Sequence, residues 1–141
     1  MITFAPLTHE RLDMMLFGTP FACAASELHK SYFSYGSPSC CLLDEGSPVF
    51  AGGIVNLQWR RGEAWILPTD YFRSHIKTCL REMREVLPKM AIGHGFVRVQ
   101  ATCVKDFSGS LFRHLGFNYE GTMVKFGPNG ETCGMYARIF E

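Results

Sequence analysis

Residues 96–117 constrain the fold of this chain more than any other stretch. Residues 96–104 alternate apolar and polar side chains with a period of two, which predicts a half-buried β-strand. Apolar residues at positions 107, 111 and 115 then recur at helical spacing until Gly116 ends the pattern. The stretch therefore predicts a strand, a short helix, a glycine stop and the start of another strand.

Local patterns predict the elements on either side of this stretch. Further strands are expected at residues 2–7, 40–43, 49–57, 63–67, 117–126 and 132–140, and further helices at residues 9–17, 20–33 and 72–87. Pro88 should kink or end the last of these helices. Gly52 and Gly53 indicate a bulge or a close backbone approach, and the apolar run at 63–67 suits a fully buried strand. The predicted order is β-α-α-β-β-β-α-β-α-β-β.

The bulk composition suits a globular protein with one domain spanning residues 1–141. The 141 residues are 47% hydrophobic and 19% charged, and no apolar run approaches a membrane span. The N-terminus lacks a basic start before an apolar core, so no signal peptide is expected and a cytoplasmic location is predicted. A formal net charge of +1 makes nucleic acid an unexpected partner.

The six cysteines form no C-x-x-C pair and have no histidine at metal-ligand spacing. We therefore expect neither a zinc site nor a thioredoxin motif, and no metal cofactor. Buried, reduced thiols are the favoured interpretation, since free cysteine is among the most buried residue types.

The sequence LFRHLGF at residues 111–117 resembles the C-terminal half of the GNAT superfamily of N-acetyltransferases, and the element order extends this resemblance over nearly the whole chain. The tail, with YEG and FGPNG, looks like the closing hairpin of small phage-encoded GNAT-like proteins. The resemblance implies an α/β (α+β) fold, with a mixed, mostly antiparallel sheet of seven strands flanked by about four helices.

The same resemblance implies an acyl-CoA-dependent N-acyltransferase that uses acetyl-CoA and a small-molecule or protein amine, with homodimer formation left open. Two parallel strands, 63–67 and 96–104, would part so that the pantetheine arm bonds their free backbone groups. The residues implied at the cofactor site are Ile66, Leu67, Thr69, Arg73 and Phe112.

The chain departs from the family at the loop that should hold the pyrophosphate. Residues 67–74 read LPTDYFRS and contain no glycine, and Asp70 adds a negative charge. Arg73 and Lys77 could compensate for this charge, or they could belong to a solvated basic helix face. His75 lies in the same region and is expected to be a capping or solvated residue.

The sequence offers more than one candidate for the general acid and for the general base. Phe112 stands where many family members carry an acidic tyrosine, which leaves Tyr119 as a candidate, with His114 expected on an outer helix face. Glu63 is a candidate base, but an exposed strand-edge charge is an equal interpretation. Glu120 is a third option, and Tyr136 is expected in the core.

A second hypothesis belongs to a different functional class. A GNAT-fold protein, phage-encoded, could have lost its cofactor chemistry and serve as a structural or host-interaction component. The missing glycines and Phe112 favour this alternative, whereas the element order fits both hypotheses.

Overall fold

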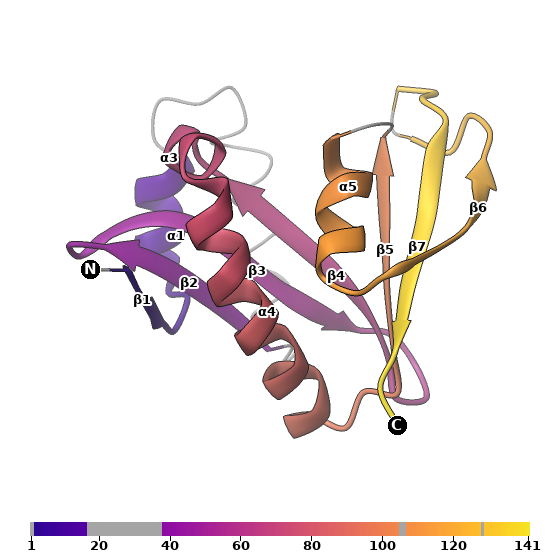
Figure 1. The fold of residues 1–141 in the computed structure, drawn as a ribbon, viewed down its shortest axis with the longest axis horizontal. Helices are drawn as coiled ribbons and strands as arrows, with labels where there is room; N and C mark the ends of the chain where they lie inside the picture. The colour runs from indigo at the N-terminus through magenta and orange to yellow at the C-terminus, as the bar shows by residue number, and fades with distance from the viewer. Residues whose placement is uncertain (1, 17–37, 105–106, 128) are drawn as a thin grey trace. The chain divides into compact units, whose positions relative to one another are not determined.

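The computed structural model describes residues 2–16, 38–104, 107–127 and 129–141 (Figure 1). Its elements are β1 (Ile2–Ala5), α1 (His9–Leu16), β2 (Ser39–Asp44), β3 (Ser47–Asn56), β4 (Arg61–Pro68), α3 (Asp70–Ser74), α4 (Ile76–Gly93), β5 (Arg98–Val104), α5 (Phe107–His114), β6 (Asn118–Met123) and β7 (Cys133–Ile139). The seven strands form one sheet in the order β1-β2-β3-β4-β5-β7-β6, with β4 and β5 parallel. The expected mixed, mostly antiparallel sheet is confirmed, while the helix expected at residues 20–33 lies outside the described residues.

The chain divides into two compact units. Unit 1 takes in Met1–Asn56 and Trp65–Cys79, and unit 2 takes in Leu57–Ala64 and Leu80–Glu141. Both β4 and α4 therefore begin in one unit and end in the other. The expectation of one domain over residues 1–141 stays a prediction.

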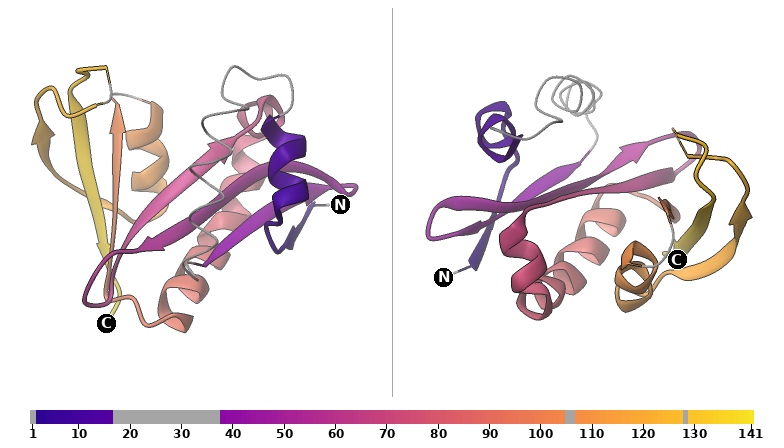
Figure 2. Two further views of the ribbon diagram at one scale, coloured as in Figure 1. Left: turned by 180° about the vertical axis from the view of Figure 1, so that it is seen from behind. Right: turned by 90° about the horizontal axis from the view of Figure 1, so that it is seen from above.

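In unit 1, the strands β2 and β3 are covered on both faces, α1 lying on one side and α3 on the other (Figure 2). The core under α1 is built from buried residues of the β1–α1 connection, α1, β2 and β3: Leu7, Leu12, Cys41, Leu43 and Ala51. On the other face, Phe50 stacks on Phe72 of α3 at a centroid distance of 4.9 Å. Burial on both faces explains why Cys41, Leu42 and Leu43 form an apolar run without alternation.

The hairpin between β2 and β3 is closed by Glu45 and Gly46, both with positive φ, between the paired residues Asp44 and Ser47. This two-residue turn falls between the strands expected at residues 40–43 and 49–57. Gly53 also behaves as expected, because a Cβ there would come within 2.5 Å of the Pro38 carbonyl oxygen. The irregularity in the β2–β3 register lies elsewhere, between Leu42 and Leu43.

In unit 2, β5 alternates as the sequence predicts, since Val99, Ala101 and Cys103 are buried and the residues between them are half-exposed. The helix α5 packs on this buried face, alongside β5 and β7 (Figure 1). Gly116 follows α5 with a φ of +88°, a conformation that favours glycine, and so ends the helix as predicted.

The long helix differs from its expected bounds at two places. The chain breaks at His75, the C-cap of α3, so that residues 72–87 belong to two helices and not to one. Pro88 lies inside α4, which continues to Gly93. Proline removes one backbone donor from a helix, and in a helix of 18 residues the other hydrogen bonds and the buried side chains of Met83 and Ala91 maintain the helix.

The strand β4 also differs from its expected form. It begins at Arg61, and the preceding turn contains Trp59 and Arg60, both with positive φ. Its residues from Glu63 to Leu67 are half-exposed, so the expectation of full burial is wrong. Trp65 and Leu67 pack against the core under α1, which accounts for the buried part of their surface.

Candidate active site

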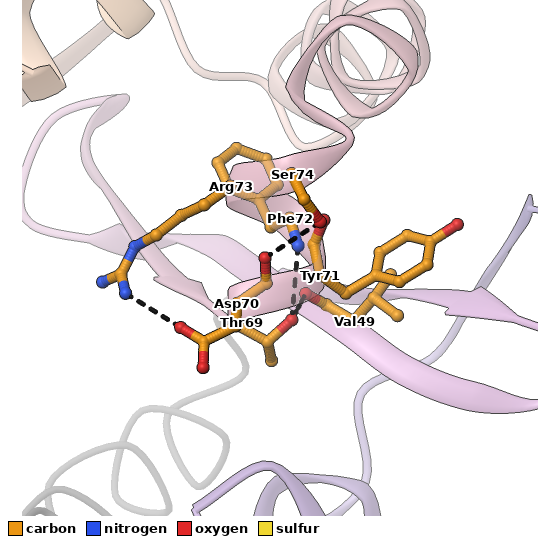
Figure 3. Close-up of polar contacts among 7 residues, drawn as sticks. All are labelled: Val49, Thr69, Asp70, Tyr71, Phe72, Arg73 and Ser74. Atoms are coloured by element: carbon orange, nitrogen blue, oxygen red, sulfur yellow. Dashed lines mark hydrogen bonds and ion pairs between the residues drawn. The ribbon is translucent and has the colours of Figure 1, made fainter.

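Thr69 joins the end of β4 to the first turn of α3 (Figure 3). Its backbone is extended, with φ −106° and ψ 175°, and its hydroxyl accepts a hydrogen bond from the Phe72 amide at 3.5 Å. The same hydroxyl donates to the Val49 carbonyl of β3 at 2.5 Å. Thr69 therefore caps the helix and ties it to the neighbouring strand of unit 1.

Replacing Thr69 with alanine should lower the free energy of unfolding by about 1 kcal/mol, because it removes an N-cap and a hydrogen bond to the strand. Urea denaturation followed by circular dichroism would measure this loss. Thr69→Ser keeps the hydroxyl and should retain most of the stability. Equal stability of the alanine and serine variants would contradict the assigned role.

Arg73 contacts the acidic residue that opens α3. Its Nη1 lies 3.1 Å from Oδ1 of Asp70, and the two side chains are 63% and 99% exposed. The guanidinium therefore offsets the carboxylate, as one of the two sequence-based interpretations requires. Because arginine carries five N–H donors, the group still has donors to offer to a phosphate.

The half-buried Tyr71 of α3 stacks on the exposed His75 that caps this helix. Their ring centroids are 4.0 Å apart, and His75 Nδ1 lies 2.9 Å from the Ser74 hydroxyl. A hydrogen bond to the Asp44 carboxylate raises the pKa of Tyr71. His75 is the solvated capping histidine that the sequence predicts.

Glu63 of β4 lies beside Gln100 of β5 in the parallel register of unit 2. This register runs from Arg61↔Arg98 to Glu63↔Gln100. Paired residues share a face of a sheet, so Glu63 and Gln100 lie on the face opposite the buried Val99 and Ala101. Arg98 lies on the same face and donates to Gln100 Oε1 at 3.3 Å.

Arg98 also forms a bidentate ion pair with Glu120, at 2.6 and 2.9 Å. Glu120 lies where the register of β6 on β7 shifts between Tyr119 and Gly121, and this bulge allows its side chain to reach Arg98 across β7. The hydrogen bonds from Arg98 lower the pKa of Glu120. Glu120 is thus held as an ion-pair partner, which weakens its case as a base.

This ion pair predicts a pH-dependent contribution to stability. Because the folded-state pKa of Glu120 lies below its usual value of 4.5, the contribution is present above that pH and is lost as pH falls through the folded-state pKa. Glu120→Gln should lower the free energy of unfolding at pH 7 by less than ~1 kcal/mol, since the pair is partly exposed.

Urea titrations from pH 7 to pH 3 would measure this difference. The gap between wild type and Glu120→Gln should close at the acidic end. A gap that stays constant across the whole range would show that the carboxylate charge contributes nothing.

The other two candidate residues lie on the opposite face of unit 2. Phe112 is 4% exposed, and its ring contacts Phe117 and Tyr136. Tyr119 is paired with Tyr136 in the antiparallel register, and its hydroxyl bonds that of Thr122. Since Tyr136 also pairs with Ala101, Tyr119 shares the α5 face, while Glu63 lies on the other.

The structure thus gathers the predicted site residues into three places. Ile66, Leu67, Thr69 and Arg73 lie together at the end of β4 and the start of α3 in unit 1. Glu63 joins the polar row of Arg98 and Gln100, while Phe112 of α5 and Tyr119 of β6 lie on the opposite face of unit 2. Arg98 and Gln100 were not among the predicted site residues, although their alternation with the buried β5 residues was a usable signal.

Other expectations concern histidine, tyrosine and cysteine. His114 is exposed on the outer face of α5 and Tyr136 is 7% exposed in the core, both as predicted. The five described cysteines are free thiols, and burial raises the pKa of Cys40 to about 12. Across the described ranges no cluster of three His, Cys, Asp or Glu side chains could hold a metal ion, and no helix is long and apolar enough to span a membrane.

Comparison with solved structures decides the fold. An N-acetyltransferase from Staphylococcus aureus superposes with a TM-score of 0.79 at 14% identity, covering 100% of this chain and 99% of that one. The chain has the GNAT fold. A ribosomal-protein-S5-alanine acetyltransferase from Vibrio fischeri superposes with a TM-score of 0.76 at 11% identity, over 98% of this chain and 92% of that one. No family model and no curated protein sequence matches the chain.

A third structure with the GNAT fold contains the cosubstrate. This acetyltransferase from Salmonella typhimurium, solved with acetyl-CoA, has a TM-score of 0.74 and 12% identity, and the match covers 99% of this chain and 94% of that one. At such identities the comparison establishes the arrangement of elements. The resemblance to phage-encoded proteins stays a prediction.

Proposed function

We propose that this GNAT-fold protein is an acyl-CoA-dependent N-acyltransferase that transfers an acetyl group to an amine. The observation that carries the proposal is the full-length match to N-acetyltransferase structures at TM-scores of 0.74 to 0.79. The parallel register of β4 and β5, with Glu63 at its last pair, supports it because the family is expected to bind the pantetheine arm where these strands part.

The residues at the end of β4 fit the pantetheine part of the cosubstrate. Ile66 and Leu67 are half-exposed, and the backbone of an extended strand can bond an extended arm as it would another strand. Backbone amides alone offer a poorer site for the pyrophosphate, because the Phe72 amide already donates a hydrogen bond to the Thr69 hydroxyl. Side chains must therefore supply phosphate contacts, with Arg73 and Lys77 as the available cations.

In this proposal Glu63 prepares the acceptor. An amine with a pKa near 10.4 is almost entirely protonated at neutral pH and must lose a proton before it attacks the thioester carbonyl. Glu63 would accept that proton through a water molecule, and the acyl–sulfur bond then breaks to release the thiolate of coenzyme A. Because a thiol has a pKa of ~8.5, this thiolate can leave without a tyrosine at position 112.

Isothermal titration with acetyl-CoA tests the proposal. We expect a micromolar dissociation constant for the wild type and roughly tenfold weaker binding for Arg73→Gln, which loses one charge-assisted phosphate contact. Arg81→Gln on α4 is the matched control and should bind like the wild type. The absence of heat at millimolar acetyl-CoA would refute the proposal.

That negative result would favour the structural or host-interaction alternative. Two observations speak for this alternative: Asp70 is almost entirely exposed at the start of α3, and Phe112 offers no hydroxyl. The titration therefore separates the two functions directly.

A further inference from the structure

A cavity of about 280 Å³ lies within unit 2 on the α5 face of the sheet. It is lined by residues of α5, β5, β6, β7 and the segment before β7. At ~30 Å³ per water molecule in the liquid, its volume corresponds to roughly nine waters. The space therefore suits a small organic molecule.

The described residues that line this cavity carry mostly hydroxyl groups, together with one positive charge. Among the described lining residues, five carry a hydroxyl group and one carries a positive charge: Ser110, Tyr119, Thr122, Thr132, Tyr136 and Arg113. None of these described residues carries a carboxylate. Hydroxyl donors beside a guanidinium favour an anion.

Arg113 is positioned to act as the anchor. Its Cζ lies 5.7 Å from the centroid of the Tyr136 ring, which places the guanidinium beside another cavity-lining group. Among the described residues, no carboxylate forms an ion pair with Arg113. A guanidinium that is not engaged by an acid has its bidentate donors available for an oxyanion.

The hydroxyl group of Tyr136 gives a second, independent indication that the cavity holds a ligand. It is 7% exposed, its hydroxyl lies against Gly109, and both residues line the cavity. Within the described part of the chain this hydroxyl has no hydrogen-bond partner. Buried polar groups are nearly always satisfied by protein, water or ligand, so a molecule in the cavity is the expected partner.

We propose that this cavity binds a small organic anion, a carboxylate or a phosphate, with Arg113 pairing with the charged oxygens. The Tyr136 hydroxyl donates to the same ligand, and the Tyr119–Thr122 hydrogen bond holds two further lining side chains in place. This site does not depend on the proposed acyl transfer, because none of these contacts involves β4 or α3.

Titration of ¹⁵N-labelled protein with propionate and with inorganic phosphate tests the site by NMR. At least one of the two anions should give saturable shifts at the amides of Ser110, Arg113, Thr122 and Gly134. The neutral analogue propionamide should give none. Arg113→Gln should weaken binding at least about tenfold, since a charge-assisted contact is lost, while Arg81→Gln, an equal charge change on α4, should leave it unchanged.

The proposal is overturned if neither anion gives saturable shifts at these amides, or if Arg113→Gln binds as tightly as wild type. Should Arg113→Gln fail to fold, the comparison of propionate with propionamide on the wild type decides the question, and equal shifts for the two refute it. Acetyl-CoA is absent from every sample, so loss of the proposed acyl transfer would not produce the same result.

Discussion

Phe72→Ala is expected to lower the free energy of unfolding by about 3–5 kcal/mol. The side chain is 0% exposed and stacks on Phe50 at 4.9 Å, so its removal loses both the buried apolar surface and a ring contact. Urea denaturation would measure the change. Phe126→Ala is the matched control, because Phe126 is 58% exposed and its truncation should change stability by no more than ~0.5 kcal/mol.

The same variant tests how firmly α3 is attached to unit 1. Phe72 packs on β3, and Tyr71 bonds Asp44 of β2, so both aromatic side chains of α3 are held within this unit. A loss below ~1 kcal/mol in Phe72→Ala would contradict the stacked geometry, since a ring buried to this extent cannot be removed at so small a cost.

The second large effect concerns the reaction. If the proposed acetyl transfer is observed, Glu63→Gln should lower kcat by about 10²- to 10⁴-fold, the usual contribution of a general base. The affinity for acetyl-CoA, measured by isothermal titration, should stay unchanged, because glutamine has nearly the same shape and the proposal has Glu63 act on the acceptor amine and not on acetyl-CoA.

Glu85→Gln is the matched control, since Glu85 is an exposed carboxylate on α4, and its kcat should equal that of the wild type. A Glu63→Gln variant with wild-type kcat would show that Glu63 is the exposed strand-edge charge of the alternative interpretation.

Local patterns were sufficient to predict most elements of the fold. The alternation in β5, the turn at Glu45 and Gly46, and the stop at Gly116 each depend on residues within a few positions of one another. Such features follow from backbone geometry and side-chain periodicity alone. They account for the confirmed strand order.

The errors came from features decided by packing. Pro88 signals a helix end on local grounds, yet α4 continues past it, because tertiary contacts outweigh one lost hydrogen bond. The partial exposure of residues 63–67 likewise depends on what covers the strand. The apolar residues of this segment do not indicate which other elements pack over the strand.

The site was less predictable than the fold for the same reason. Arg98 and Glu120 are 22 positions apart and belong to strands separated by β7 in the sheet, so their pairing follows from strand order and a bulge. The placement of Glu63 and Tyr119 on opposite faces also required the registers. The cavity beside Arg113 arises from small residues on several elements, which no single motif reveals.

The division of the chain has a consequence for dissecting the protein. Three junctions link the two units, at Asn56/Leu57, Ala64/Trp65 and Cys79/Leu80. No single cleavage can release either unit as one continuous polypeptide, and the junctions inside β4 and α4 run through hydrogen-bonded backbone. Deletion fragments are therefore unsuitable for assigning activities, and the intact chain is the smallest unit in which either proposed site can be tested.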